Sequence, residues 1–180
     1  MGPNGLGVCS SRPRTPGHGK ARACRKADNI LMPIKNFRER GLMTAVTVPV
    51  PIATSYFQYD QQGVVFNMWY FGWFDDAMTQ FLGEVGYPYT ALNADGLDVQ
   101  LVHTEADWRD AVRYGEQVVI DVATERIGST SFTLSFGVRV GEQVRSTGRT
   151  VYVVVSTDGS GKRSVPPKLR VGLESALADR

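Results

Sequence analysis

One long apolar segment stands out from the alternating pattern of the rest of the chain. Nearly every residue from Val64 to Phe74 is apolar, which is typical of a helix buried on most of its sides. The residues that follow place polar side chains on one helical face, at Asp75, Asp76, Thr79, Gln80 and Glu84. The pattern therefore predicts one long helix, and the glycines at Gly83 and Gly86 predict where it ends.

Most of the other patterned segments are rich in β-branched and aromatic residues, which favours strands. The prolines within 46–58 predict an edge strand there, because proline cannot donate a ladder hydrogen bond. Longer strands are expected at 97–108, 117–127, 130–140 and 143–155. A loop is expected at 93–96, a tight turn at Gly141, and a short helical tail from Lys168.

These elements together predict the fold class. Consecutive strands with short links favour an antiparallel sheet, and a helix that is apolar on most sides needs a sheet curled around it. The predicted fold is α+β, the hotdog arrangement, with an antiparallel sheet of about five strands around one long central helix. No apolar stretch reaches the length of a membrane span, so none is expected.

Charge separates the first 42 residues from the rest. Residues 1–42 hold nine lysines and arginines against two acidic residues, whereas the remaining 138 carry a net charge of −5. The basic segment lacks apolar periodicity and is expected to be a disordered extension or a misplaced translation start. An organellar transit peptide and a nucleic-acid-binding arm are the alternatives. The folded domain is expected at 43–180, and a cytoplasmic location follows from the missing secretory signal.

The scarcity of cysteine and histidine limits the chemistry that this domain can perform. Both cysteines, Cys9 and Cys24, lie in the basic segment, and the domain has one histidine, His103. A cysteine nucleophile and a cysteine-rich zinc site are therefore excluded from the domain. No nucleophile-elbow pattern supports a triad through His103. Any hydrolysis is expected to depend on a carboxylate, with no metal and no cofactor.

Asp60 is the candidate carboxylate. It precedes a turn, "DQQG", that ends at Gly63 and leads into the apolar segment. An aspartate in this position often serves the turn or caps the following helix. It can also act as a nucleophile or general base on a carbonyl whose oxygen faces the free N–H groups of a helix start.

Three blocks of sequence resemble one branch of the hotdog acyl-CoA thioesterases, the 4-hydroxybenzoyl-CoA thioesterase and YbgC-type branch. The first block is Asp60, two residues, "GVVF" and an aromatic helix ending in "WFDDA". The second is "AVRYGEQVVIDV", and the third runs from "IGSTSFTLSFGV" to "GRTVYVVVS". The resemblance extends from about residue 47 to residue 173.

This resemblance implies a function and a set of site residues. It implies hydrolysis of acyl- or aroyl-CoA by Asp60, at the interface of a homodimer that in some relatives pairs into a tetramer. Gly63 and Asn67 are expected to position the carbonyl, Tyr56 to shape the site, and Phe66 and Trp69 to contact the acyl group. At Asn67 many relatives carry His or an aromatic residue, and an amide cannot exchange a proton near neutral pH.

Several alternatives remain open from the sequence alone. Asp75 or Asp76 is a rival catalyst, because another hotdog branch uses a carboxylate on the helix. Two further alternatives are an enzyme that releases an acyl or polyketide chain from a carrier protein instead of CoA, and a non-catalytic subunit that binds acyl-CoA. The domain itself is expected to bind neither nucleic acid nor membrane. The spacing does not separate nucleophilic attack from general-base catalysis, and it assigns no residue to the CoA phosphates.

Overall fold

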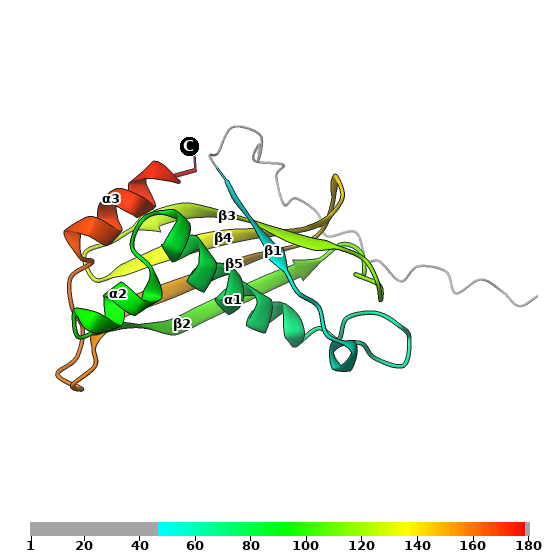
Figure 1. Ribbon diagram of the computed structural model, residues 1–180, viewed down its shortest axis with the longest axis horizontal. Helices are drawn as coiled ribbons and strands as arrows, with labels where there is room; N and C mark the ends of the chain where they lie inside the picture. The colour runs from blue at the N-terminus through cyan, green and yellow to red at the C-terminus, as the bar shows by residue number, and fades with distance from the viewer. Residues whose placement is uncertain (1–46, 179–180) are drawn as a thin grey trace, which may run out of the picture. The chain divides into compact units, whose positions relative to one another are not determined.

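A computed structural model describes residues 47–178, which form a five-stranded antiparallel sheet (Figure 1). The strands lie in the order β1-β3-β4-β5-β2. They span β1 (Val48–Ile52), β2 (Leu97–Trp108), β3 (Val118–Ile127), β4 (Ser131–Val140) and β5 (Gln143–Ser156). The helices are η1 (Tyr56–Gln58), α1 (Trp69–Glu84), α2 (Tyr89–Ala94) and α3 (Pro167–Ser175). The predicted extension at 1–42 lies outside the described residues.

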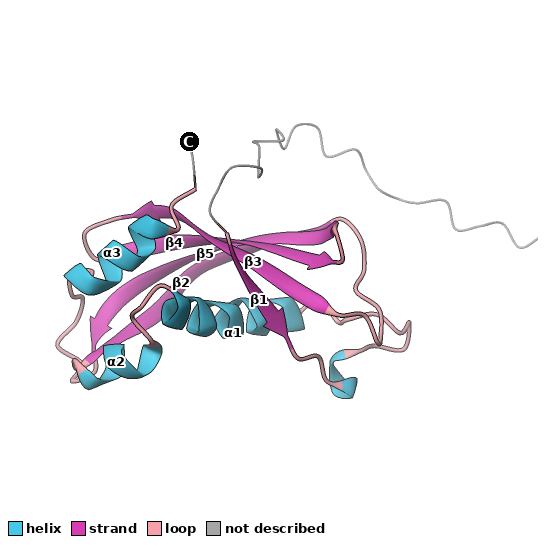
Figure 2. Ribbon diagram, turned by 45° about the horizontal axis from the view of Figure 1, so that its top comes forward, coloured by secondary structure: helices cyan, strands magenta, loops and turns pink. Residues whose placement is uncertain are grey.

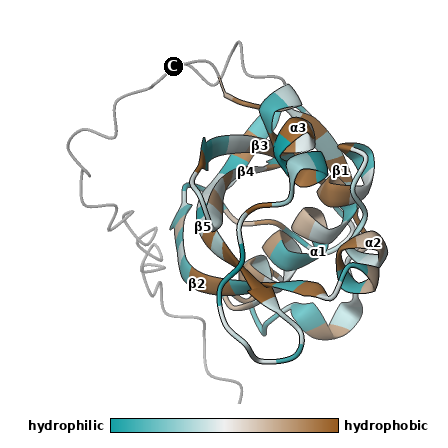
Figure 3. Cartoon of the chain, turned by 90° about the vertical axis from the view of Figure 1, so that its left-hand side faces the viewer, coloured by the Kyte–Doolittle hydropathy of each residue, from teal (hydrophilic) through white to brown (hydrophobic). Residues whose placement is uncertain are grey.

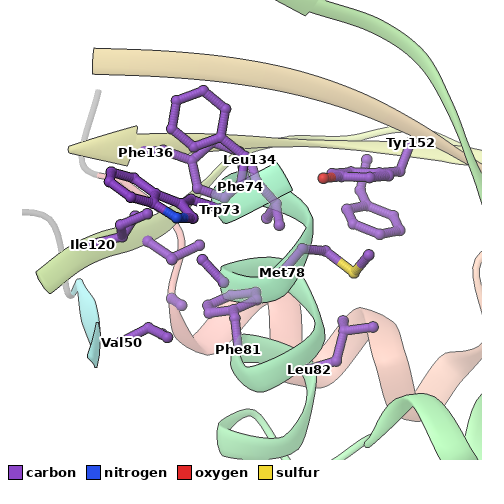
Figure 4. Packing of buried hydrophobic residues seen from close by; sticks show 14 of the residues in the cluster. Val50, Trp73, Phe74, Met78, Phe81, Leu82, Ile120, Leu134, Phe136 and Tyr152 are labelled. Atoms are coloured by element: carbon purple, nitrogen blue, oxygen red, sulfur yellow. The ribbon is translucent and has the colours of Figure 1, made fainter. Parts of the chain in front are cut away.

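The long helix α1 lies along one face of the sheet, as Figure 2 shows. Its buried side chains include Trp73, Phe74 and Phe81, each at most 1% exposed. They face sheet residues such as Phe136, whose ring stacks on that of Phe74 with centroids 4.7 Å apart (Figure 4). Burial of these large rings supplies much of the apolar area that stabilises the fold. The predicted α+β hotdog fold is confirmed.

The sheet curves around α1, and the two shorter helices, α2 and α3, lie beside it near its C-terminal end (Figure 3). A Cβ added at Gly172 of α3 would lie 2.4 Å from the carbonyl oxygen of Val85, so α3 packs tightly on the end of α1. The residues after α3 then join the free edge of β3, where Thr124 exchanges hydrogen bonds of 2.8 Å with Ala176 and Ala178. The helix α3 therefore packs at the C-terminal end of α1 and does not cover its N-terminal end.

The strands and the C-terminal helix appear where the sequence predicts them, and Gly141 takes a positive φ of 57° at its turn. The first strand is shorter than expected, because residues after Ile52 turn away into η1. The predicted start of the long helix at Val64 is wrong. It begins at Trp69, because Val64 and Val65 form isolated β-bridges instead of a first helical turn. The helix α2 was not predicted.

The length and composition of the helices bear on membrane insertion. Within the part of the chain that the structure describes, no helix is both long and apolar enough to cross a bilayer.

Candidate functional site

The segment between η1 and α1 contains a short hairpin, residues 58–66, called here the Asp60 hairpin. The N–H of Asp60 donates to the carbonyl of Val64 over 2.9 Å, and the N–H of Gly63 donates to the carbonyl of Asp60 over 3.0 Å. Gly63 has a φ of +72°, which glycine adopts at little cost. Two backbone hydrogen bonds and this glycine therefore fix the turn that carries the candidate carboxylate.

The side chain of Asp60 also serves this turn. Its Oδ1 accepts the N–H of Gln62 over 2.7 Å, the side-chain-to-backbone bond of an Asx turn. Asp60 is half-buried, and no hydrogen bond or ion pair from residues 47–178 reaches its Oδ2. One carboxylate oxygen thus orients the side chain, while the other is available for chemistry.

The start of α1 offers unpaired hydrogen-bond donors. The helix begins at Trp69 with Met68 at the N-cap, and no side chain within residues 47–178 caps it. The N–H of Trp69 donates to the carbonyl of Phe66 over 3.0 Å, but those of Asn67, Met68 and Tyr70 donate to no carbonyl within 47–178. Free N–H groups at the positive end of a helix dipole stabilise a developing negative charge.

In the structure Gly63 lies in the Asp60 turn, apart from the start of the helix. Residues 64–68 lie between Gly63 and the first residue of the helix. Gly63 therefore shapes the Asp60 turn and does not contribute to the helix start. Asn67 is exposed and directly precedes the N-cap residue, so its backbone N–H belongs to the group of unpaired donors.

Exposed aromatic side chains accompany the hairpin and the helix start. Tyr56 is 82% exposed and its ring meets that of Tyr114 edge-on, with centroids 5.9 Å apart. Phe57 packs edge-on against Trp69 at 5.1 Å, and Phe66 is 46% exposed. Tyr56, Phe66 and Trp69 thus lie on or beside the hairpin and the helix start. Sequence reasoning missed Phe57 and Tyr114, since neither contact follows from spacing.

Residues 109–116, which follow β2, support the hairpin from its other side. The N–H of Val65 donates to the carbonyl of Val112 over 2.9 Å, and the N–H of Tyr114 donates to the carbonyl of Gly63 over 3.2 Å. This segment acts as a third strand beside the hairpin. The second sequence block of the resemblance, which begins at residue 111, therefore has a structural role next to the candidate carboxylate.

The rival carboxylates lie elsewhere on α1. Asp75 and Asp76 are exposed on the polar face that the sequence predicts. Asp75 Oδ1 accepts the hydroxyl of Tyr152, a buried residue of β5, over 3.0 Å. Burial, and then the charge of Asp75, raise the pKa of Tyr152 above its usual range. Asp75 therefore satisfies a buried hydroxyl about 9 Å along the helix from its first residue, given the helical rise per residue.

His103 lies on β2 as a surface residue. Its Nε2 is 3.6 Å from Glu105, and both side chains are more than half exposed. His103 is therefore a solvent-exposed residue of the edge strand, paired with a neighbour on the same strand.

Comparison with families of known proteins gives a match over most of the described chain. The model of the thioesterase-like superfamily matches residues 58–173, which include the Asp60 hairpin, the long helix and all of the sheet except the first strand. The match therefore covers both parts of the candidate site.

Individual relatives match over shorter stretches. The chain is 27% identical over 81 residues to a putative esterase of Aquifex aeolicus, which is 45% of this chain and 63% of that protein. It is 32% identical over 97 residues to a 1,4-dihydroxy-2-naphthoyl-CoA hydrolase of Prochlorococcus marinus, or 49% of this chain and 63% of that protein. The chain thus spans less than two thirds of the length of either relative.

Among solved structures, a protein from Pseudomonas aeruginosa has a similar fold. The TM-score is 0.67 at 23% identity, covering 73% of this chain and 92% of the other. At that identity the likeness establishes the shared fold.

Proposed function

The chain belongs to the thioesterase-like superfamily, and from that membership and the geometry around Asp60 we propose that it hydrolyses the thioester of an acyl- or aroyl-CoA. The products are the free acid and CoA. The observation that carries the proposal is the Oδ2 of Asp60, which has no partner within residues 47–178. Its turn lies nine residues before the start of α1, where N–H groups also lack a partner within that range. A thioester carbonyl needs both a nucleophile or base and donors for its oxygen.

In the proposed mechanism, the carbonyl oxygen of the substrate accepts hydrogen bonds from the N–H groups of Asn67, Met68 or Tyr70. These bonds strengthen as the oxygen becomes negative. The Asp60 carboxylate then acts by one of two routes. Direct attack breaks the C–S bond, expels the CoA thiolate and leaves a mixed anhydride that water cleaves. In the general-base route Asp60 takes a proton from a water that attacks the carbonyl carbon, and the thiolate leaves from the tetrahedral intermediate.

The aromatic side chains around the hairpin suit the acyl part of the substrate. Phe66 and Trp69 flank the helix start, and Tyr56 lies on η1 immediately before the hairpin. Apolar walls with few polar groups are typical of small-molecule sites. We assign the chain to the 4-hydroxybenzoyl-CoA thioesterase and YbgC-type branch. The support is the motif from Asp60 to Phe66, together with a relative that is named as a naphthoyl-CoA hydrolase.

We further propose that the active unit is a homodimer or homotetramer with the site at the dimer interface. The twelve-residue strand β2 is an edge of the sheet, and its exposed apolar residues include Leu101 and Val102. A long edge strand of this kind is a template for pairing with another chain. The exposed aromatic residues on and just before the hairpin, Tyr56, Phe57 and Phe66, also favour a cover that a second copy would supply.

Thiol release from a panel of short, long and aryl acyl-CoAs tests the proposal. Asp60→Asn keeps an oxygen that accepts the Gln62 N–H but removes the charge, whereas Asp60→Ala removes both. We expect the Asn variant to melt like the wild type while its hydrolysis falls by about a hundred- to ten-thousandfold. The Ala variant should lose activity and some stability as well.

Two other outcomes would point elsewhere. Unchanged hydrolysis in Asp60→Asn, with lower stability in Asp60→Ala only, would reduce Asp60 to a turn residue and direct attention to Asp75 and Asp76. A folded wild type that cleaves none of the acyl-CoAs would contradict the proposed substrate class. An acyl chain on a carrier protein, or a binding role without catalysis, would then be the next hypothesis.

A further inference from the structure

Arg145, on β5, is a nearly buried arginine that has no part in the proposed mechanism. Its side chain is only 12% exposed, and its Nε is buried with no hydrogen-bond partner among residues 47–178. Its Nη1 contacts Asp110, and its Nη2 is 3.5 Å from Oε1 of Glu116. Burying a guanidinium destabilises the folded state unless it is paired. The role of Arg145 is therefore sought through its two partners, Asp110 and Glu116.

Asp110 and Glu116 stand near the two ends of the 109–116 segment and fix its backbone. Asp110 Oδ1 accepts the N–H of Ala111 over 2.8 Å, and Glu116 Oε2 accepts the N–H of Arg113 over 2.6 Å. The carbonyl of Arg145 itself accepts the N–H groups of Arg109 and Asp110, over 2.8 and 2.9 Å. One residue of β5 therefore holds this segment through both its side chain and its backbone.

The same segment is bonded on its other side to both parts of the candidate site. Val112 accepts from Val65 and Tyr114 donates to Gly63, so the Asp60 hairpin is attached to it. The N–H of Val112 also donates to the hydroxyl of Tyr70, in the first turn of α1, over 3.4 Å. The segment thus links the hairpin that carries the carboxylate to the helix start that carries the donors.

We propose that Arg145 is a positioning residue. Through Asp110 and Glu116 it fixes the 109–116 segment, and this segment sets the place of the Asp60 turn relative to the start of α1. The inference rests on the proposed hydrolase function, because its effect on rate requires Asp60 to act on a substrate held at that helix. Misplacing a reacting group by about 1 Å lowers rates by up to about a hundredfold, which is why the support of a catalytic turn matters.

The pKa of Asp110 agrees with a charged pair at neutral pH. The hydrogen bond from Ala111 lowers the pKa of this carboxyl, and the charges of Arg145 and Arg113 lower it further. A lowered pKa means that the stabilisation from this carboxylate is fully present above the ordinary aspartate pKa of about 4. It is lost only as the pH falls through the pKa of the folded state. The effect of Arg145 should therefore be constant across neutral pH.

A second arginine on the sheet gives a matched control. Arg139, on β4, is paired with Asp121 of β3 through its Nε at 2.8 Å, and the two side chains are 27% and 19% exposed. Its Nη1 donates to Gly141 at the next turn. Neither of these partners belongs to the 109–116 segment or the Asp60 hairpin, so loss of this pair is a loss of sheet stability alone.

The experiment compares Arg145→Met, Arg145→Lys and Arg139→Met in the full chain. We expect Arg145→Met to lower kcat by about ten- to a hundredfold with little change in KM, at a constant ratio from pH 6 to 9. Arg145→Lys should recover part of the rate, since an ammonium keeps the charge but not the two-armed geometry. Arg139→Met should leave kcat unchanged, whatever it does to the melting temperature.

Amide hydrogen exchange gives a readout that needs no substrate. We expect the N–H groups of Asp60, Gly63 and Val65 to exchange at least about tenfold faster in Arg145→Met, with strand amides unaffected. The proposal would be refuted if Arg145→Met kept the hydrogen exchange and the kcat of the wild type. It would also be refuted if Arg139→Met changed both as much as Arg145→Met does. Faster hairpin exchange in a protein that cleaves no thioester would support the link to the hairpin and refute the hydrolase. If Arg145→Met does not fold, Asp110→Asn with Glu116→Gln provides the same test.

Discussion

At the scale of single residues, Asp60 shows that a turn role and a catalytic role are compatible. The Asx bond to Gln62 occupies Oδ1 only, and the bond fixes the direction in which Oδ2 points. An aspartate that merely stabilised the turn would be replaceable by asparagine, whose side-chain oxygen accepts the same bond. The charge is the property that asparagine lacks, so this substitution separates the two roles.

Tyr87 carries a prediction about alkaline pH. Its hydroxyl donates to Asp95 over 2.5 Å in a site where the residue is 3% exposed. Burial and then Asp95 raise the pKa of Tyr87 to about 12. The folded state therefore holds this proton more tightly than the unfolded state. Its contribution to stability is complete below about pH 10 and is lost as the pH rises toward 12.

Replacing this tyrosine by phenylalanine should flatten the dependence of stability on pH. At pH 7 the variant is expected to lose about 1 kcal/mol with the hydrogen bond, and between pH 9.5 and 11 its free energy of unfolding should fall less steeply than that of the wild type. Tyr89, whose pKa is also raised to about 12, leaves a residual slope. Urea unfolding at several pH values measures this, and parallel slopes would show that Tyr87 does not ionise differently on folding.

At the scale of elements, the close approach of β5 to α1 is the most demanding contact. A Cβ on Gly148 would lie 2.3 Å from two atoms of the Phe74 ring, and that ring is stacked on Phe136 and cannot move freely. Gly148→Ala should therefore destabilise the protein by about 1–3 kcal/mol or more, as overpacking does.

A second glycine supplies the control for this substitution. Gly83, near the end of α1, has no atom within 4 Å of an added Cβ. Gly83→Ala should stabilise the protein by about 0.4–1 kcal/mol, because alanine reduces the entropy of the unfolded chain. Denaturant midpoints compare the two variants. Stabilisation by Gly148→Ala, as by Gly83→Ala, would mean that the contact between Gly148 and Phe74 does not limit packing.

The elements that the sequence predicts well are those whose pattern extends over many residues. Four strands of ten residues or more match their predicted ranges within one residue at each end, because β-branched residues and turn glycines mark both limits. The predicted helix start was too early because Val64 and Val65 are apolar residues. A short apolar run of this kind fits a buried β-bridge as well as a helix. The six-residue helix α2 is too short for any periodicity.

The candidate site was predictable only in part. The positions of Asp60 and Gly63 followed from a local turn motif. The support from residues 109–116 and from Arg145 did not, since those contacts join segments that are 29 or more residues apart in the chain. Long-range ion pairs have no signature in spacing, and a basic residue on a strand is usually a surface residue.

At the scale of the whole molecule, a monomer leaves the outer edge of β2 without a neighbouring strand among residues 47–178. Among the described strands, β2 pairs only with β5, and a β-bulge falls at Val102, between the paired residues Leu101 and His103. If a second copy pairs here, a charge on this strand should weaken the association, as lysines do on natural edge strands.

Val102→Lys is the corresponding substitution, and Val171→Lys is its control. The two valines are 56% and 67% exposed, but Val171 lies on α3, away from β2. We expect Val102→Lys to shift the protein toward monomer in sedimentation experiments and to lower hydrolysis together with assembly. Val171→Lys should leave both unchanged. A wild type that is monomeric and fully active would contradict the interface account.

If the charge of Asp60 performs the hydrolysis, one measurement shows it. The measurement is the rate of thiol release by Asp60→Asn divided by that of the wild type, on the best acyl-CoA of the panel, with both proteins shown to melt at the same temperature. We expect a ratio between about one hundredth and one ten-thousandth. A ratio near one would contradict it, because the turn would then be the only role of Asp60.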